Sequence, residues 1–353
     1  MLPEDLREAI DAGLPILQQD LRAISFANFD LRNSIFVECN LAGADLSTAL
    51  TDDVMWTSCD LSHVRLATAP RKKMMLVKCN AAGLSAPGAL WSDLMMVETA
   101  LEGANFAAGR FERAMFVAAD LKGADFSQSH FDTCVLMRCG LEKLNLTQTT
   151  MLNCGVIEGD AATADLTGLT IDGGLLAMLT LDGRDFSGQS LQRVNFMKSS
   201  LAGARFDSAD LTQSLFIEAN LAGASMESIR APTAMFMGAD ITRARFNNAI
   251  LDMANFMQTK ADLADFSGAR MEMAQLGEAS MRGARFTNTR LTMADASNAN
   301  IDAAQFANAS IHRLSLHAAS LNATLLEGAR GSPIGTDPHR FAAERYVPAP
   351  VKD

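Results

Sequence analysis

The sequence predicts a repeat protein that grows as a stacked array, rather than a chain of two or three globular domains. A large apolar residue recurs at every fifth position, as at Leu101, Phe106 and Phe111. A small residue such as Ala104 stands two positions before it. This register runs through 62 five-residue units from residue 21 to residue 326 without insertion or deletion. Neither the helical period of 3.6 nor the strand period of 2 explains the spacing.

Triplets such as Ala44-Asp45-Leu46 resemble the A(D/N)LXX consensus of the pentapeptide repeat family. The resemblance covers residues 21–326 and implies an all-β fold, a right-handed quadrilateral β-helix in which four pentapeptides form one square coil. In that fold the central Leu or Phe and the small residue two before it point inward, and the other three positions point outward. A narrow square interior accepts one large side chain per side only beside a small neighbour. The solenoid would have about 15 coils, stacked about 4.8 Å apart.

Both ends of the chain lie outside the repeat. We expect residues 1–20 to form an N-terminal helical cap, because Pro3 opens a helix start and the first coil of a β-stack needs a cover. Residues 21–326 are expected to form the pentapeptide-repeat β-helix. Residues 327–353 carry Gly and Pro and are expected to form an extended C-terminal tail, with a helical turn at His339–Tyr346.

The repeat weakens between residues 49 and 90. Thr51 and Arg71 occupy central positions, which the repeat directs inward. A buried and unpaired guanidinium is costly. We therefore expect Arg71 to bulge outward together with Lys72 and Lys73.

One wall of the square coil is apolar on its outside as well as its inside. β-Propensity favours Val and Ile in any strand, but it explains neither why one wall alone carries them nor why Met dominates there. A large exposed apolar patch usually marks an interface, and Met adapts to a varied partner. The predicted partner-binding residues are Ile35, Val37, Met55, Met75, Val77, Met95, Val97, Met115, Val117, Val135, Met137, Ile157, Leu175, Met197, Leu215, Ile217, Met235, Met237 and Met257.

No catalytic residue, cofactor or metal is predicted. The chain has no Gly-rich phosphate loop and no nucleophile motif. All six cysteines take the small inward position, and Cys39, Cys59 and Cys79 recur at the coil spacing, close enough for oxidation to a disulfide. No histidine or second cysteine pair stands at zinc-ligand spacing. We interpret the cysteines as small buried apolar residues.

Charge and hydropathy limit the partner classes. The net charge is −11 and no long basic run occurs, so direct nucleic-acid binding is not expected. The N-terminus lacks the apolar core of a signal peptide, and no apolar run approaches the ~18 residues of a membrane span. We therefore expect a cytoplasmic protein, with export by a signal-independent route left open.

These observations predict a non-enzymatic scaffold whose apolar wall binds a protein partner or a second copy. The N-terminal pattern, the long array and the Met-rich strands resemble pentapeptide repeat proteins associated with bacterial type VI secretion, which implies an accessory or adaptor role in effector loading. The alternative is a DNA mimic that binds DNA gyrase or topoisomerase IV, as some members of the family do, and an acidic surface is its precondition. A third hypothesis is peripheral membrane association, for which the wall lacks a basic rim.

Overall fold

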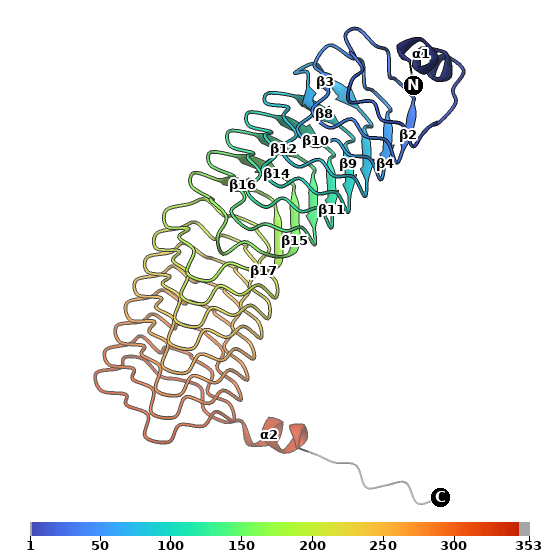
Figure 1. Ribbon diagram of the computed structural model, residues 1–353. Helices are drawn as coiled ribbons and strands as arrows, with labels where there is room; N and C mark the ends of the chain where they lie inside the picture. Colours follow the sequence, from blue (N-terminus) through green and yellow to red (C-terminus); the bar gives the residue numbers. More distant parts are fainter. Residues whose placement is uncertain (1, 346–353) are drawn as a thin grey trace, which may run out of the picture. The chain divides into compact units, whose positions relative to one another are not determined.

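The computed structural model describes residues 2–345 and divides into two compact units, Met1–Thr180 (unit 1) and Leu181–Asp353 (unit 2). In both units each coil pairs in parallel with the next, so that a residue lies beside the residue 20 positions later, as Phe116 beside Leu136. Figure 1 shows the stacked coils. The predicted all-β pentapeptide-repeat β-helix is confirmed.

Two faces of unit 1 are continuous parallel sheets. The nine-stranded sheet has the order β1-β2-β4-β7-β9-β11-β13-β15-β17, and the six-stranded sheet the order β16-β14-β12-β10-β8-β6. The first consists of β1 (Ile16–Leu17), β2 (Ile35–Val37), β4 (Met55–Thr57), β7 (Met75–Val77), β9 (Met95–Val97), β11 (Met115–Val117), β13 (Val135–Met137), β15 (Gly155–Asp160) and β17 (Leu175–Thr180). The second consists of β6 (Arg71–Lys72), β8 (Leu90–Ser92), β10 (Arg110–Glu112), β12 (His130–Asp132), β14 (Thr150–Leu152) and β16 (Thr170–Asp172). A two-stranded sheet joins β3 (Asp45–Leu46) and β5 (Arg65–Leu66).

The five-residue spacing produces the core of unit 1. The central residues of the pentapeptides are buried, with half-buried Leu166 as the exception, and aromatic rings from successive coils stack inside, as Phe36 on Trp56 with centroids 4.2 Å apart. The small residue two positions earlier, such as Ala114, is fully buried beside them. Because stacked coils bring equivalent positions together, Trp91, Phe111 and Phe131 form a stack of rings inside the six-stranded sheet, whereas the inner column of the nine-stranded sheet mixes rings with aliphatic residues such as Leu76.

The expectation that Arg71 bulges outward is wrong. Arg71 is 3% exposed, and β6 pairs it in register with Trp91 of the next coil. Its guanidinium donates to Thr51 Oγ1 at 2.9 Å and to the carbonyl oxygens of Ala67 and Ala69. It also lies 5.3 Å from the Trp91 ring. Burial lowers the Arg71 pKa to about 10, so the group stays charged at neutral pH and these acceptors compensate its lost hydration.

A helix lies at the start of unit 1. α1 (Pro3–Asp11) buries Leu6 completely. The Arg7 guanidinium carbon lies 4.5 Å from the ring centroid of Phe29 in the first coils. Apolar and cation–π contacts therefore hold α1 against the β-helix.

Unit 2 is the more regular of the two β-helices. Phe196, Phe216, Phe236 and Phe256 form a single stack with centroids 5.0, 5.0 and 4.7 Å apart. Its coils pair through isolated bridges, and within its described residues no multi-residue strand forms. The corners are closed by tight turns, as where the Ala219 amide donates to the Phe216 carbonyl at 3.1 Å. Closed corners shorten the extended segment on each side of the coil.

The end of the described chain forms a helix. α2 (Pro338–Glu344) begins after Asp337, whose side chain accepts the amides of His339 and Arg340. Of the expected tail, residues 346–353, which include Tyr346, lie outside the described residues. From residue 2 to residue 345, no helix has the length and apolar character required to cross a membrane.

Candidate functional site

The predicted apolar wall is the outer side of the nine-stranded sheet in unit 1. Successive residues of a strand point to opposite sides, so Phe116 is buried while Met115 and Val117 face outward. The register places Met75, Met95 and Met115 directly beside one another. We call the outward residues of this sheet the apolar face: Ile35, Val37, Met55, Met75, Val77, Met95, Val97, Met115, Val117, Val135, Met137, Ile157 and Leu175.

The side chains of the apolar face are partly accessible. Ile35 is 41% exposed, Met115 37% and Met55 36%, and the other residues of the face are half-buried. Each side chain is partly covered by its equivalents in the neighbouring coils, about 4.8 Å away. Thr57 is the polar exception between Val37 and Val77. The result is a pair of nearly uninterrupted apolar columns.

The other predicted site residues lie in unit 2 and form a surface of their own. Met197, Leu215, Ile217, Met235, Met237 and Met257 are all half-buried. Leu215 bridges Met235, and polar Asn195 and Asn255 stand at the two ends of that column. This second surface is shorter than the apolar face of unit 1.

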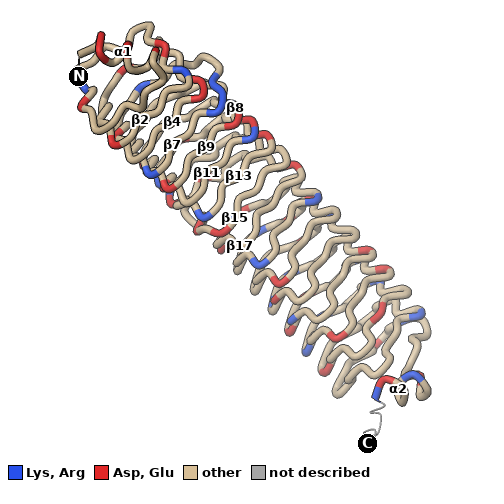
Figure 2. The backbone as a smooth tube through the Cα atoms, turned by 90° about the vertical axis from the view of Figure 1, so that its right-hand side faces the viewer, with Lys and Arg blue, Asp and Glu red and all other residues tan. Residues whose placement is uncertain are grey.

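Two rims of corner residues border the apolar face, and the five-residue repeat gives no signal that distinguishes them from other corners. Every rim residue is exposed, and all have a positive φ, as in Asp93 with φ of 56°. The leading rim, before each strand, is Asn33, Asp53, Lys73, Asp93, Arg113 and Thr133. The trailing rim, after each strand, is Glu38, Ser58, Lys78, Glu98, Ala118, Arg138 and Glu158. Figure 2, which turns this sheet toward the viewer, shows charged positions along its edges and uncharged strand centres.

Charges of opposite sign alternate along the rims and pair within the chain. In the leading rim, Arg113 Nε lies 2.7 Å from Asp93 Oδ1, and Lys73 Nζ lies 3.8 Å from Asp53 Oδ1. The hydrogen bond from Arg113 holds the Asp93 pKa below its ordinary value of 3.8. All four side chains are at least 41% exposed, so these pairs contribute little to stability.

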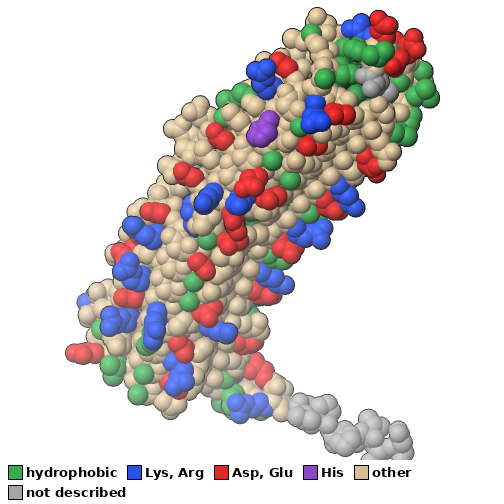
Figure 3. All heavy atoms as spheres, viewed as in Figure 1, with side chains coloured by type: hydrophobic (Ala, Val, Ile, Leu, Met, Phe, Trp, Pro, Cys, Tyr) green, Lys and Arg blue, Asp and Glu red, His purple; other side chains and the backbone are tan. Residues whose placement is uncertain are grey.

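The neighbouring six-stranded sheet has a mostly polar exterior, with Leu90 and Leu152 as apolar outward residues. Its outward residues include Arg110 and Glu112, which form an ion pair of 3.3 Å, and His130, Asp132 and Thr150. Figure 3 shows, over a broad face of the molecule, charged side chains of both signs mixed with scattered apolar ones. The apolar face therefore differs from an adjoining sheet with the same backbone.

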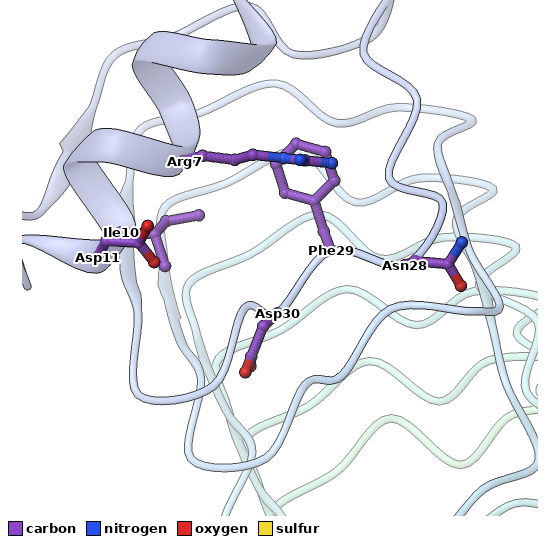
Figure 4. A pocket seen from close by; sticks show the side chains of 6 residues that line it. All are labelled: Arg7, Ile10, Asp11, Asn28, Phe29 and Asp30. Carbon is purple, nitrogen blue, oxygen red and sulfur yellow. The ribbon is translucent and has the colours of Figure 1, made fainter.

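The cysteines and a pocket beside α1 are the features of the described residues that bear on catalysis or metal binding. The six cysteines are free and buried, and burial raises the Cys139 pKa to about 11. Among residues 2–345, no three His, Cys, Asp or Glu side chains are grouped to hold a metal ion. The pocket in Figure 4 has a volume of about 200 Å³ and is lined by Arg7, Ile10, Asp11, Asn28, Phe29 and Asp30. The Arg7 side chain lies across Phe29 there, which is the α1 contact described above.

The stacked coils and paired small and large core residues define a class, the parallel β-solenoids with four-sided coils. The family model described as pentapeptide repeats matches the chain in eight copies, over residues 20–50, 96–132, 114–151, 181–216, 214–252, 239–272 and 264–302. The matches cover more than half of the chain, and the protein belongs to the pentapeptide repeat family. Comparison with curated proteins gives no match.

Solved structures of pentapeptide repeat proteins are similar to this chain at low identity. Rfr23 from the cyanobacterium Cyanothece 51142 is 20% identical, over 33% of this chain and 90% of its own, with a TM-score of 0.27. QnrB1, a plasmid-mediated fluoroquinolone resistance protein, is 14% identical over 59% and 93%, with a TM-score of 0.29. HetL from Nostoc sp. strain PCC 7120, involved in heterocyst differentiation regulation, is 18% identical over 94% of both chains, with a TM-score of 0.17.

Proposed function

We propose that the chain is a non-enzymatic interaction scaffold and that the apolar face of unit 1 binds a protein, either a different partner or a second copy. The observation that carries the proposal is an apolar patch bordered by charged rims. Protein interfaces have this anatomy, with an apolar, Met-enriched core inside a polar rim. Membership of a family of non-catalytic repeat proteins supports the proposal.

The area of the apolar face is consistent with a specific but moderate interaction. Eight coils at about 4.8 Å by a strand width of about 10 Å give roughly 400 Å². Burial at ~25 cal/mol/Å² contributes about 10 kcal/mol before the costs of association. Those costs are about 4–15 kcal/mol. At the low end of these costs about 6 kcal/mol remains, so we expect a Kd of tens of micromolar or weaker rather than an obligate complex.

Substitution of the face by charge tests the proposal. The variant combining Met95→Glu, Met115→Glu and Val117→Glu places three carboxylates at the centre of the apolar columns. We expect it to abolish association measured by light scattering and by capture of a purified partner. Because the three side chains point outward, the β-sheet circular dichroism should be unchanged.

The matched control carries the same charge on the other sheet. Leu90→Glu, Thr150→Glu and Leu152→Glu alter outward positions of β8 and β14. This variant should bind as the wild type does. If the first variant keeps every association of the wild type, the apolar face is not the binding surface.

For the unit 2 residues Met197 to Met257 we propose a second, smaller contact surface. It has one column of four apolar side chains (Met197, Ile217, Met237 and Met257) and one of two (Leu215 and Met235), fewer than the apolar face of unit 1, and is therefore expected to be the weaker surface. Met237→Glu should therefore reduce affinity less than Met115→Glu does. Equal effects would contradict this ranking.

The cellular setting we propose is that of a cytoplasmic bacterial accessory or adaptor protein of type VI secretion. It is supported by the N-terminal pattern and the Met-rich strands described above. Spike and effector genes beside the gene for this chain are the expected finding. A gene neighbourhood without any secretion component would contradict this setting and leave the binding surface unaffected.

The alternative function is a DNA mimic that binds DNA gyrase or topoisomerase IV. Mimicry needs a continuous acidic surface, whereas the outward columns of the nine-stranded sheet are apolar and its rims alternate in sign. We expect no effect of micromolar protein on gyrase supercoiling. Inhibition or protection of gyrase would favour the alternative.

A further inference from the structure

We propose that the occupant of the apolar face is a second copy of this chain, packed antiparallel, with a two-fold axis between β7 and β9. This inference rests on the proposed function of the face. It is carried by the charges of the two rims, which match those of a second copy in this arrangement.

A two-fold dimer that packs this face against itself has its axis in the plane of contact. If the axis runs along the stack, the copies are parallel and the leading rim of one faces the trailing rim of the other at the same coil. If the axis runs along the strands, the copies are antiparallel and each rim faces its own equivalent. The rim charges distinguish these two arrangements.

The parallel arrangement brings like charges together. Lys73 would face Lys78 of the second copy, and Asp93 would face Glu98. Symmetry repeats each of these contacts, so four like-charge contacts would flank the apolar columns. Like charges opposed across an interface are unfavourable and exclude wrong partners.

The antiparallel arrangement pairs the leading rim with complementary charge. With the axis between β7 and β9, Lys73 faces Asp93 of the second copy and Asp53 faces Arg113. These four residues are the only charged ones in the leading rim as defined above. Each of the four therefore faces a residue of opposite charge in the second copy.

The trailing rim agrees with the same axis, although its sequence is different. Lys78 faces Glu98 of the second copy, and Glu38 faces Arg138. The uncharged Ser58 and Ala118 face each other. Two rims with different charge patterns thus have complementary charges about the same axis.

About this axis, apolar residues of one copy also face apolar residues of the second copy. Met75 faces Met95 of the second copy, Met55 faces Met115, and Ile35 faces Val135. A shift of the axis by half a coil spacing toward β4 puts Lys73 opposite itself, and the same shift toward β11 puts Asp93 opposite itself. The charges therefore fix the register as well as the direction.

The contact area is near the lower limit for a stable dimer. Eight facing strands at about 4.8 Å, with a rim-to-rim width of at most about 16 Å, give roughly 600 Å² per copy. Specific interfaces bury about 1,200 Å² or more in total. We therefore expect a reversible dimer in which the apolar columns supply affinity and the exposed rim charges supply orientation.

Charge exchange between two variants tests the antiparallel dimer. Lys73→Glu opposes Asp93 with a second carboxylate, and Asp93→Lys opposes Lys73 with a second ammonium. Each variant alone should dimerise about tenfold more weakly than the wild type at low salt, since each change is repeated by symmetry. An equimolar mixture of the two restores both complementary contacts and should recover wild-type affinity.

The readout is the mass from light scattering across a concentration series of the full chain, between 37.8 kDa and twice that value. Both substituted residues are exposed, and circular dichroism verifies that each variant is folded. A mixture that dimerises no better than either variant overturns the antiparallel arrangement. A wild-type chain that stays monomeric up to several hundred micromolar overturns the second copy as occupant.

The two proposals fail in different ways. A monomeric wild type that captures a different purified protein through Met95, Met115 and Val117 retains the proposed function and removes the dimer. If the wild type dimerises and the variant with glutamate at all three positions dimerises equally well, both the proposed function and the proposed dimer are wrong. Loss of the dimer in that variant, together with recovery in the mixture of charge variants, supports both.

Discussion

The two sheets of unit 1 have the same backbone and differ in what they present to solvent. Both are parallel ladders paired every 20 residues, and both bury a central side chain, Phe116 in β11 and Phe111 in β10. On β11 the flanking residues are Met115 and Val117, whereas on β10 they are Arg110 and Glu112. The inward positions thus determine the fold, and the outward positions are free to differ with function.

The largest expected effect is a loss of stability from substitutions in the buried core, which the two sheets have in common. Phe116→Ala and Phe111→Ala each leave a cavity in the buried aromatic core and should cost about 3–5 kcal/mol of unfolding free energy. Urea unfolding followed by circular dichroism measures both. Similar losses would show that the two cores are equivalent, and a cost below about 1 kcal/mol for either would contradict the stacked core.

The next largest effect is the loss of stability expected when Arg71, the one charged inward residue of the six-stranded sheet, is replaced. Arg71→Ala removes the donor to Thr51 and to two backbone carbonyls and opens a cavity, so we expect a loss of about 2–4 kcal/mol. Lys72→Ala, at the exposed neighbouring position, is the control and should change stability by less than about 0.5 kcal/mol. If the two variants unfold alike, the buried interactions of Arg71 do not stabilise the coil.

A smaller effect separates the outer surfaces. Val117→Thr and Leu152→Thr each place a β-branched polar residue outward, one on each sheet, and each should alter stability by less than about 1 kcal/mol. The expected difference lies in binding, with association weakened severalfold by Val117→Thr alone. Equal weakening by both variants, measured by light scattering, would remove the distinction between the surfaces.

The smallest expected effect is on the pH dependence of stability, through the ion pair of Asp93 at the corner between the two sheets. Because Arg113 lowers the Asp93 pKa in the folded state, the ion pair contributes fully above pH 3.8 and is lost as the pH falls through the lowered pKa. Asp93→Asn should therefore reduce the melting temperature slightly at neutral pH, with the difference from wild type shrinking below pH 3.8. A difference that grows on acidification would contradict the ion pair.

Much of this architecture could be predicted because it is encoded locally. The five-residue spacing that places Phe116 inside also places Met115 outside, so both the core and the candidate surface follow from the periodicity. Arg71 was wrongly predicted, because its acceptors at Ala67 and Ala69 are backbone atoms and its ring partner Trp91 lies a full coil away. The sequence shows the charge of Arg71 but not these compensating contacts.

Other features depend on neighbours that the repeat does not reveal. The alternation of the rims becomes visible only when residues 20 apart, such as Lys73 and Asp93, are placed side by side. The five-residue repeat of the sequence continues past Thr180, so it gives no sign of the division into two units there. α2 is held by His317, which is 2% exposed and lies 3.1 Å from Glu344, although these residues are far apart in sequence. Tertiary contacts of this kind have no signature in a five-residue pattern.

Methionine oxidation read by mass spectrometry tests the central claim most directly, because it reports which surface association covers. Met55, Met75, Met95 and Met115 lie on the apolar face, whereas Met253, Met273 and Met293 are 44–49% exposed corner residues of unit 2. We predict that the first group becomes protected from peroxide as the chain associates while the second group oxidises at an unchanged rate. Association that leaves the four methionines of the apolar face as reactive as in the dilute chain would contradict the account.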